Sequence, residues 1–172
     1  KGAFILDTRI PQEFEKGFIP GSVNIGLNGS FAIWVGTLIE DVNHPIVLVT
    51  ESGKESEAII RLARVGYENV KGFLAGGIIS WEKAGKKTDS VHSISPLELK
   101  KLIGNANINI LDVRRESEYE NGYLKGALNI PLTDLPKRFS ELINEQSIFV
   151  HCQGGYRSMI ASSWLKKNGY SA

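Results

Sequence analysis

The sequence of 172 residues has little of the chemistry that cross-links proteins or binds metals. It contains one cysteine, so no disulfide can form within the chain and a reducing compartment is expected. Its three histidines, His44, His92 and His151, are scattered and make no metal-ligand pattern with Cys152. No apolar stretch approaches the roughly 18 residues that span a bilayer. The sequence therefore predicts a cytoplasmic protein with no metal, no other cofactor and no membrane partner.

An excess of charge of either sign is also absent. The 20 Lys and Arg residues are balanced by 19 Asp and Glu residues, which leaves a formal net charge of +1. A nearly neutral chain offers no basic surface for nucleic acid or for an acidic membrane. With 42% hydrophobic and 23% charged residues, the chain has a globular composition, and its length allows one domain or two small ones.

An internal repeat is the strongest pattern in the chain. The stretch LDTRIPQEFEKGFIPGSVNI at residues 6–25 matches LDVRRESEYENGYLKGALNI at residues 111–130 without a gap, and nine positions are identical. Further on, LARVGY at residues 62–67 resembles LKKNGY at residues 165–170. We therefore predict two tandem copies of one structural unit.

Each copy is predicted to be an α/β domain with a mainly parallel sheet flanked by helices. The apolar runs FILD, NINILD, PIVLVT and SIFVHC are typical of short strands buried on both faces. The stretch SPLE at residues 95–98 is a helix start with a capping box, and a polar segment precedes it. We assign residues 1–88 to the first domain, 89–94 to a linker and 95–172 to the second domain.

The repeat also predicts that both ends of the chain are cut. The capped helix of the second copy would map before residue 1 in the first copy. The first copy continues through residues 69–81, whereas the second copy stops before the corresponding strand and turn.

The only thiol lies in the stretch HCQGGYRS at residues 151–158, between a predicted strand and a predicted helix. Gly154 and Gly155 allow the backbone to curl, so that successive N–H groups point inward beside those of the helix N-terminus. Such a loop stabilises an anion and therefore favours the thiolate of Cys152, the nucleophilic form. Arg157 adds a positive charge at the rim. A cysteine that only packs is the plainer interpretation, but the composition of this loop favours a reactive one.

Two neighbours of the thiol are less informative. Adjacent residues of a strand point to opposite sides, so His151 is predicted to face away from Cys152 and to have a structural role. Tyr156 lies within the loop, where it either contacts substrate or packs at the rim.

Asp112 and Arg114 end the strand beside the loop, at the sheet edge where α/β proteins place their chemistry. Their counterparts Asp7 and Arg9 recur in the copy without a cysteine. We therefore interpret Asp112 and Arg114 as supporting residues. Arg114 would act either through an ion pair with Glu118 or through a hydrogen bond that braces a loop.

Four motifs of the second copy together resemble the rhodanese family of sulfurtransferases: DVR at residues 112–114, EY at 118–119, GYLKGALNIP at 122–131, and the cysteine loop. The resemblance covers nearly the whole chain as a tandem pair. The first copy also contains GSVNIGLNGSFAIWVGTLI at residues 21–39. This segment is similar to rhodanese modules of persulfide dioxygenase–sulfurtransferase fusion proteins. That similarity implies an N-terminal metallo-β-lactamase-fold domain as a partner that this chain lacks.

The resemblance implies a two-step transfer of sulfane sulfur. Cys152 would take the sulfur from thiosulfate or a low-molecular-weight persulfide, and a thiophilic acceptor would then remove it. The substrates and partners are thus small sulfur-containing anions and thiols. The persulfide would be held by the loop residues that follow the cysteine, Gln153, Gly154, Gly155, Tyr156, Arg157 and Ser158.

Two other functions remain open for the second copy. Some phosphatases of the same fold use a cysteine loop with five residues between Cys and Arg, whereas four residues separate Cys152 from Arg157. The shorter loop suits one sulfur atom better than a phosphate group. Alternatively, the pair of domains is a non-catalytic binding or regulatory module, and Cys152 is a redox-sensing thiol.

The first copy has no cysteine where the repeat places one. Its stretch VTESGKES at residues 49–56 aligns either Thr50 or Glu51 with Cys152, depending on a one-residue gap. Neither side chain can hold a persulfide. We predict that the first domain is inert, and that it serves either as a docking or regulatory pseudo-domain or only to complete an interface with its neighbour.

Overall fold

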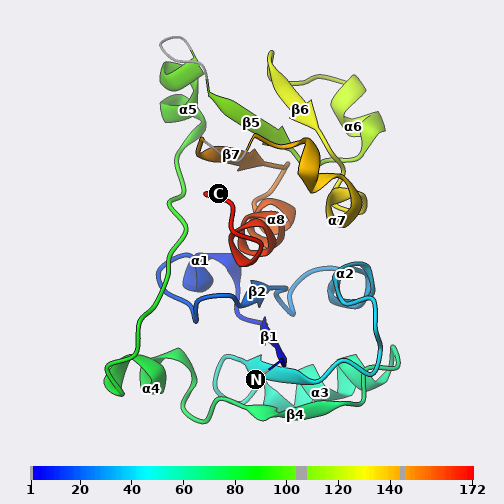
Figure 1. Ribbon diagram of the computed structural model, residues 1–172, viewed down its shortest axis with the longest axis vertical. Coiled ribbons are helices and arrows are strands. Elements are labelled where there is room, and N and C mark those ends of the chain that lie inside the picture. Colours follow the sequence, from blue (N-terminus) through cyan, green and yellow to red (C-terminus); the bar gives the residue numbers. More distant parts are fainter. Residues whose placement is uncertain (1, 104–107, 144–145) are drawn as a thin grey trace. The chain divides into compact units, whose positions relative to one another are not determined.

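The computed structural model describes residues 2–103, 108–143 and 146–172. The chain divides into two compact units, Lys1–Ser90 and Val91–Ala172 (Figure 1). The boundary falls inside the segment predicted to be a linker. Asp89 still belongs to the first unit, because its backbone N–H and C=O exchange two hydrogen bonds of 2.9 Å with Phe18.

A four-stranded parallel sheet with the strand order β2-β1-β3-β4 forms the centre of the first unit (Figure 1). Its strands are β1 (Phe4–Asp7), β2 (Val23–Asn24), β3 (Ile46–Val49) and β4 (Val70–Phe73). The helices of this unit are α1 (Pro11–Phe14), α2 (Phe31–Leu38), α3 (Glu55–Ala63) and α4 (Gly77–Lys83).

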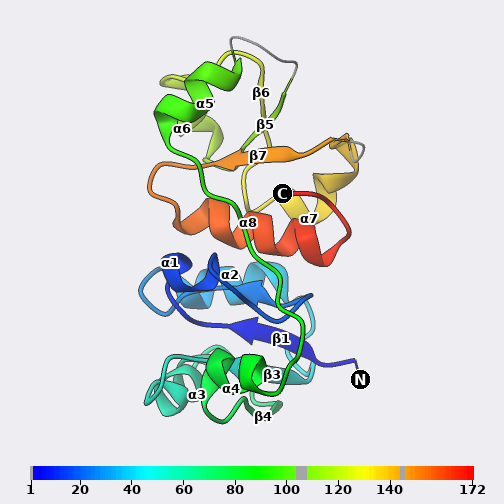
Figure 2. The same cartoon turned by 90° about the vertical axis from the view of Figure 1, so that its left-hand side faces the viewer.

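The described part of the second unit contains a three-stranded parallel sheet with the order β6-β5-β7. Its strands are β5 (Asn109–Asp112), β6 (Ala127–Asn129) and β7 (Ile148–His151). The helices are α5 (Pro96–Ile103), α6 (Glu116–Glu120), α7 (Leu135–Arg138), the short 3-10 helix η1 (Phe139–Glu141) and α8 (Tyr156–Lys167), which runs beside β7 (Figure 2). Residue 107, predicted to open the strand NINILD, lies outside the described residues.

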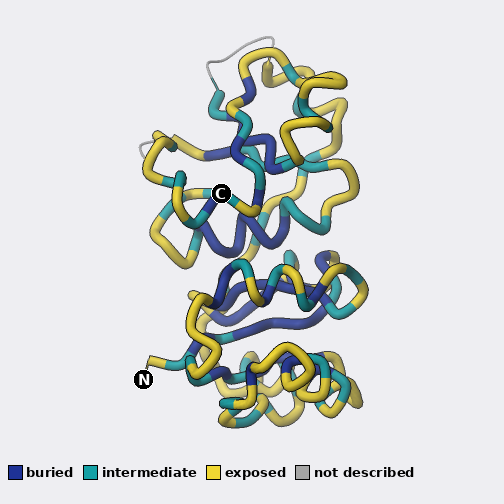
Figure 3. Tube along the Cα trace, turned by 90° about the vertical axis from the view of Figure 1, so that its right-hand side faces the viewer, coloured by how far each residue is buried: buried dark blue, intermediate teal, exposed yellow. Residues whose placement is uncertain are grey.

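The buried strands and one buried helix account for the two cores. In β1 and in β3, three of the four residues are buried, as expected for strands covered on both faces (Figure 3). Helix α8 is buried from Met159 to Leu165. The predicted capping box is also confirmed: the Ser95 N–H donates to Glu98 Oε2 over 2.7 Å, and the Glu98 N–H donates to Ser95 Oγ over 3.3 Å. The predicted α/β class, with a mainly parallel sheet in each of two domains, is confirmed.

A buried ion pair closes the carboxyl end of the central strand in the first unit. Asp7 is fully buried, and Arg9 Nη2 lies 2.7 Å from its Oδ2. The same guanidinium nitrogen donates to the backbone oxygen of Gly17 over 2.9 Å. Burial raises the pKa of the Asp7 carboxyl, and the hydrogen bonds and charge of Arg9 oppose this increase. The pair therefore fixes both the strand end and the loop after α1.

The second unit contains the same ion pair and the same hydrogen bond to a glycine backbone oxygen. Arg114 Nη2 lies 2.6 Å from Asp112 Oδ2 and donates to the backbone oxygen of Gly122 over 2.8 Å. Asn129 Nδ2 donates to the backbone oxygens of Asp112 and Arg114, as Asn24 does to Asp7 and Arg9 in the first unit. The recurrence in both units shows a framework that does not depend on the cysteine.

This framework predicts an asymmetric response of the two units to the loss of the arginine. Arg9→Met leaves a buried carboxylate without its cation, and we expect a loss of about 3–5 kcal/mol in the stability of the first unit. Arg114→Met should cost the second unit less, because the Arg114 side chain is 17% exposed against 6% for Arg9. Native-state hydrogen exchange of the β1 and β5 amides would measure both effects.

Lys16→Met is the matched control for these variants. The Lys16 ammonium pairs with Glu13 on the surface, where both side chains are about half exposed or more, so its loss should leave protection unchanged. Equal protection in Arg9→Met and in the control would contradict the role assigned to the buried pair.

Candidate active site

The sulfur of Cys152 lies at the start of helix α8, directly after β7. The backbone N–H of Ser158 donates to Cys152 Sγ over 3.3 Å, and the Ser158 hydroxyl oxygen lies 3.5 Å from the same sulfur. The Ser158 hydroxyl in turn donates to the backbone oxygen of Gly155 over 3.0 Å. The sulfur is thus held within the first turn of the helix, where N–H groups have no partner of their own.

Only one of the two loop glycines needs to be glycine for its backbone conformation. Gly155 is the N-terminal cap of α8 and adopts the left-handed conformation, with φ 85° and ψ −25°. A side chain there would strain the turn. At Gly154 φ is not positive, and a Cβ atom would meet nothing within 4 Å. The curl of the loop around Cys152 therefore depends on Gly155.

The loop residues differ in exposure. Gln153, Gly154 and Gly155 are exposed, whereas Cys152, Tyr156, Arg157 and Ser158 are half-buried. The thiol is therefore packed against its neighbours but is not sealed in the core.

Arg157 reaches across to helix α6 and forms a two-fold ion pair with Glu118. Nη1 lies 2.6 Å from Glu118 Oε2, and Nη2 lies 2.7 Å from Oε1. The hydrogen bond from Arg157, with further contributions from the Arg115 N–H and from the charges of Arg157 and Arg114, lowers the pKa of the Glu118 carboxyl to about 2. The pKa of Arg157 is raised, first by the hydrogen bond to Glu118 and less by the nearby sulfur of Cys152.

The predicted ion pair between Arg114 and Glu118 is therefore wrong, and the alternative hydrogen bond that braces a loop is the one that forms. Arg114 is directed at Asp112 and at the backbone oxygen of Gly122, which leaves the Glu118 carboxylate for Arg157. The repeat marked this glutamate as a shared position, but the partner comes from a loop that differs between the two copies.

His151 lies on the same side of the sheet as Asp112, its direct neighbour on β5. Its Nε2 atom is 3.1 Å from Asp112 Oδ2 and has no hydrogen-bond partner among the described residues. The side chain is thus directed at the supporting frame.

The strand register identifies the counterpart of Cys152 in the first unit. Asp7 pairs with Val49 in the first sheet and Asp112 pairs with His151 in the second. Because Asp7 and Asp112 are equivalent, the residue after β3, Thr50, corresponds to Cys152. One residue fewer separates Val49 from the buried Leu62 than separates His151 from the buried Leu165. This difference lies beyond the turn, because Gly53 (φ 82°) follows Thr50 by three residues just as Gly155 (φ 85°) follows Cys152.

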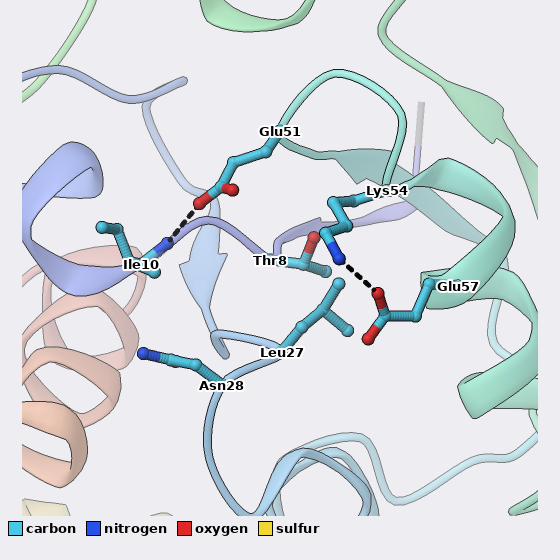
Figure 4. Close-up of a pocket in the computed structure, with 7 residues that line it drawn as sticks. All are labelled: Thr8, Ile10, Leu27, Asn28, Glu51, Lys54 and Glu57. Carbon is cyan, nitrogen blue, oxygen red and sulfur yellow. Dashed lines mark hydrogen bonds and ion pairs between the residues drawn. The ribbon is translucent and has the colours of Figure 1, made fainter.

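An open cavity of about 160 Å³ lies beside the loop that follows β3 (Figure 4). Glu51 points across it, and the Ile10 N–H donates to Glu51 Oε1 over 3.4 Å. Lys54 pairs with Glu57 over 2.8 Å. The remaining lining residues are Thr8, Leu27 and Asn28. The sequence drew attention to Glu51 but did not reveal the cavity, which forms where the loops after β1, β2 and β3 approach one another.

Within residues 2–103, 108–143 and 146–172, no helix is long and apolar enough to cross a membrane. The same residues contain no group of three or more His, Cys, Asp and Glu side chains arranged to hold a metal ion.

Comparison with known proteins places both units in one family. The sequence pattern of the family described as "Rhodanese-like domain" matches residues 1–84 and again residues 95–172. Among solved structures, a Rhodanese_3-like domain from Anabaena sp. has a TM-score of 0.50 and 22% identity over 55% of this chain and 98% of that domain, which supports the fold.

Curated relatives have varied names. YrkF of Bacillus subtilis (strain 168), named as a candidate sulfur carrier protein, is 36% identical over 90 residues, which are 52% of this chain and 49% of the relative. A tRNA uridine(34) hydroxylase of Staphylococcus epidermidis is 35% identical over 82 residues, 44% of this chain and 26% of the relative. The chain thus spans half or less of the length of these relatives. The two matches of the family pattern, together with the fold, show that this chain belongs to the rhodanese family and carries two copies of its domain.

Proposed function

We propose that the second domain is a sulfurtransferase that carries sulfane sulfur as a persulfide on Cys152. The observation that supports this most directly is the 3.3 Å hydrogen bond from the Ser158 N–H to Cys152 Sγ at the start of α8. A backbone N–H at a helix N-terminus that donates to the sulfur can also stabilise the outer sulfur of a persulfide anion. Membership of the rhodanese family agrees with sulfur transfer as the general chemistry.

The proposed reaction has two steps, and both are displacements at sulfur. In the first, the Cys152 thiolate attacks the sulfane sulfur of the donor, a new S–S bond forms, and the donor S–S bond breaks. The bonding electrons leave with sulfite if the donor is thiosulfate, or with a thiolate if it is a persulfide. In the second, an acceptor thiolate, sulfite or cyanide attacks the outer sulfur and displaces the Cys152 thiolate. No external oxidant or reductant is consumed.

The chain has no second thiol, and this limits the second step. Cys152 is the only cysteine, so a protein disulfide within the chain cannot release the sulfur. The acceptor must therefore be a small nucleophile or a thiol outside these 172 residues. A cytoplasmic location remains a prediction that agrees with this dependence on free thiols.

Intact-mass measurement tests the proposal. After exposure to thiosulfate or to glutathione persulfide, the wild-type protein should gain the mass of one sulfur atom, and cyanide should remove it. Cys152→Ser should gain nothing, because a hydroxyl is not a nucleophile toward sulfane sulfur under these conditions. An unmodified wild-type protein with both donors, with the fold verified, would leave the redox-sensing or binding alternatives.

Thr50→Cys tests whether the first domain is inert only because it lacks a thiol. The register places residue 50 at the position of the nucleophile, but Glu51 brings a negative charge beside it. In a Cys152→Ser background, we expect no persulfide on Cys at position 50 with either donor. Transfer at a rate within tenfold of the wild type would show that Glu51 is no barrier.

A further inference from the structure

Arg157 brings a positive charge to the segment that holds Cys152, but the carboxylate of Glu118 already balances that charge. Both terminal nitrogens of its guanidinium are directed at the two oxygens of Glu118, at 2.6 and 2.7 Å. The negative charge of Cys152 makes a smaller contribution than Glu118 to the raised pKa of this guanidinium. The side chains are 20% and 29% exposed, so the pair is only partly screened by solvent.

Glu118 is fixed by more than this ion pair. Its Oε2 atom also accepts the backbone N–H of Arg115 over 3.0 Å, at the N-terminus of α6. The low pKa of its carboxyl, about 2, keeps it ionised at every pH at which a thiolate exists in quantity. Compensation of Arg157 is thus a permanent feature of the site.

The first unit has a glutamate at the equivalent position, but this glutamate pairs with a surface lysine. Glu13 occupies the position of Glu118 in the repeat, and its carboxylate pairs with Lys16 over 2.6 Å on the surface. A glutamate in this position is therefore compatible with the framework whether or not it reaches a loop arginine. The contact of Glu118 with Arg157 belongs to the unit that contains Cys152.

We propose that Glu118 is a specificity-determining residue, which cancels the charge of Arg157 and so favours sulfur donors with little negative charge over the dianion thiosulfate. The inference rests on the proposed sulfurtransferase function and names its donor class. A low-molecular-weight alkyl persulfide, neutral or singly charged at its sulfane end, is the donor that fits.

The two donors place different charge beside Cys152 in the first step. The thiolate and thiosulfate bring three negative charges together, and the products are a persulfide anion and the sulfite dianion. The thiolate and a neutral alkyl persulfide bring one negative charge together, and the products are the protein persulfide and an alkyl thiolate. Because Glu118 neutralises Arg157, this guanidinium does little to offset the repulsion between the thiolate and thiosulfate. The site therefore lowers the barrier less for thiosulfate than for a neutral alkyl persulfide.

Glu118→Gln tests the inference, with Glu13→Gln as the matched control from the first unit. The measured quantity is the ratio of kcat/KM for thiosulfate to kcat/KM for glutathione persulfide, each with the same acceptor. We expect Glu118→Gln to raise this ratio about tenfold, the order of effect of one unit charge on an extra negative charge at a partly exposed site. Glu13→Gln and Glu118→Asp, which retains the charge, should leave the ratio as in the wild type.

A glutamate that only positions the loop would give a different result, because its loss would lower kcat/KM for both donors by the same factor. An unchanged ratio in Glu118→Gln, with persulfide still forming on Cys152, therefore overturns this inference and leaves the proposed function intact. No persulfide in the wild type with either donor would overturn both.

A measurement on the wild-type protein applies if Glu118→Gln does not fold. With Arg157 compensated, kcat/KM for thiosulfate should stay level or rise as the salt concentration is increased, since screening then weakens only the repulsion between anions. A steep fall with salt would show that an uncompensated cation attracts the donor, and this too would overturn the inference.

Discussion

A buried carboxylate at the carboxyl end of the central strand constrains each of the two domains. Asp7 and Asp112 are fully buried, and a buried charge without a partner costs several kcal/mol. Arg9 and Arg114, two residues further along, supply the partner and also bind the backbone oxygen of a glycine in the following loop. One ion pair thus joins the strand end to the loop beyond the helix that follows it. This pair therefore fixes the geometry of the sheet edge next to the cysteine loop.

The same edge carries a cysteine in one domain only, and the difference is local. Strand register aligns Thr50 of the first domain with Cys152 of the second, so both residues follow the same strand end of the shared framework. What differs is the thiol itself and the charge of Glu51, because both loops have a glycine of positive φ three residues further on, Gly53 and Gly155. Framework and chemistry are therefore separable features of this fold.

Much of this could be predicted because the signals are local or repeated. The strands ending at Asp7 and Asp112, the capping box at Ser95 and the tandem arrangement all follow from short patterns read directly along the sequence. The partner of Glu118 could not be predicted in this way. Two arginines, 114 and 157, are both close enough to the carboxylate to act on its pKa, and the choice between them depends on how Asp112 directs Arg114. Such a choice depends on three-dimensional packing between distant segments.

The two copies of this glutamate show how a shared position acquires a function. In the first domain Lys54, at the end of the loop after β3, pairs with Glu57 on the following helix, and Glu13 pairs with Lys16. In the second domain the first turn of α8 carries Arg157, whose planar guanidinium engages both oxygens of Glu118 on α6. One arginine in this turn therefore brings the glutamate at the shared position into contact with the segment that contains the cysteine.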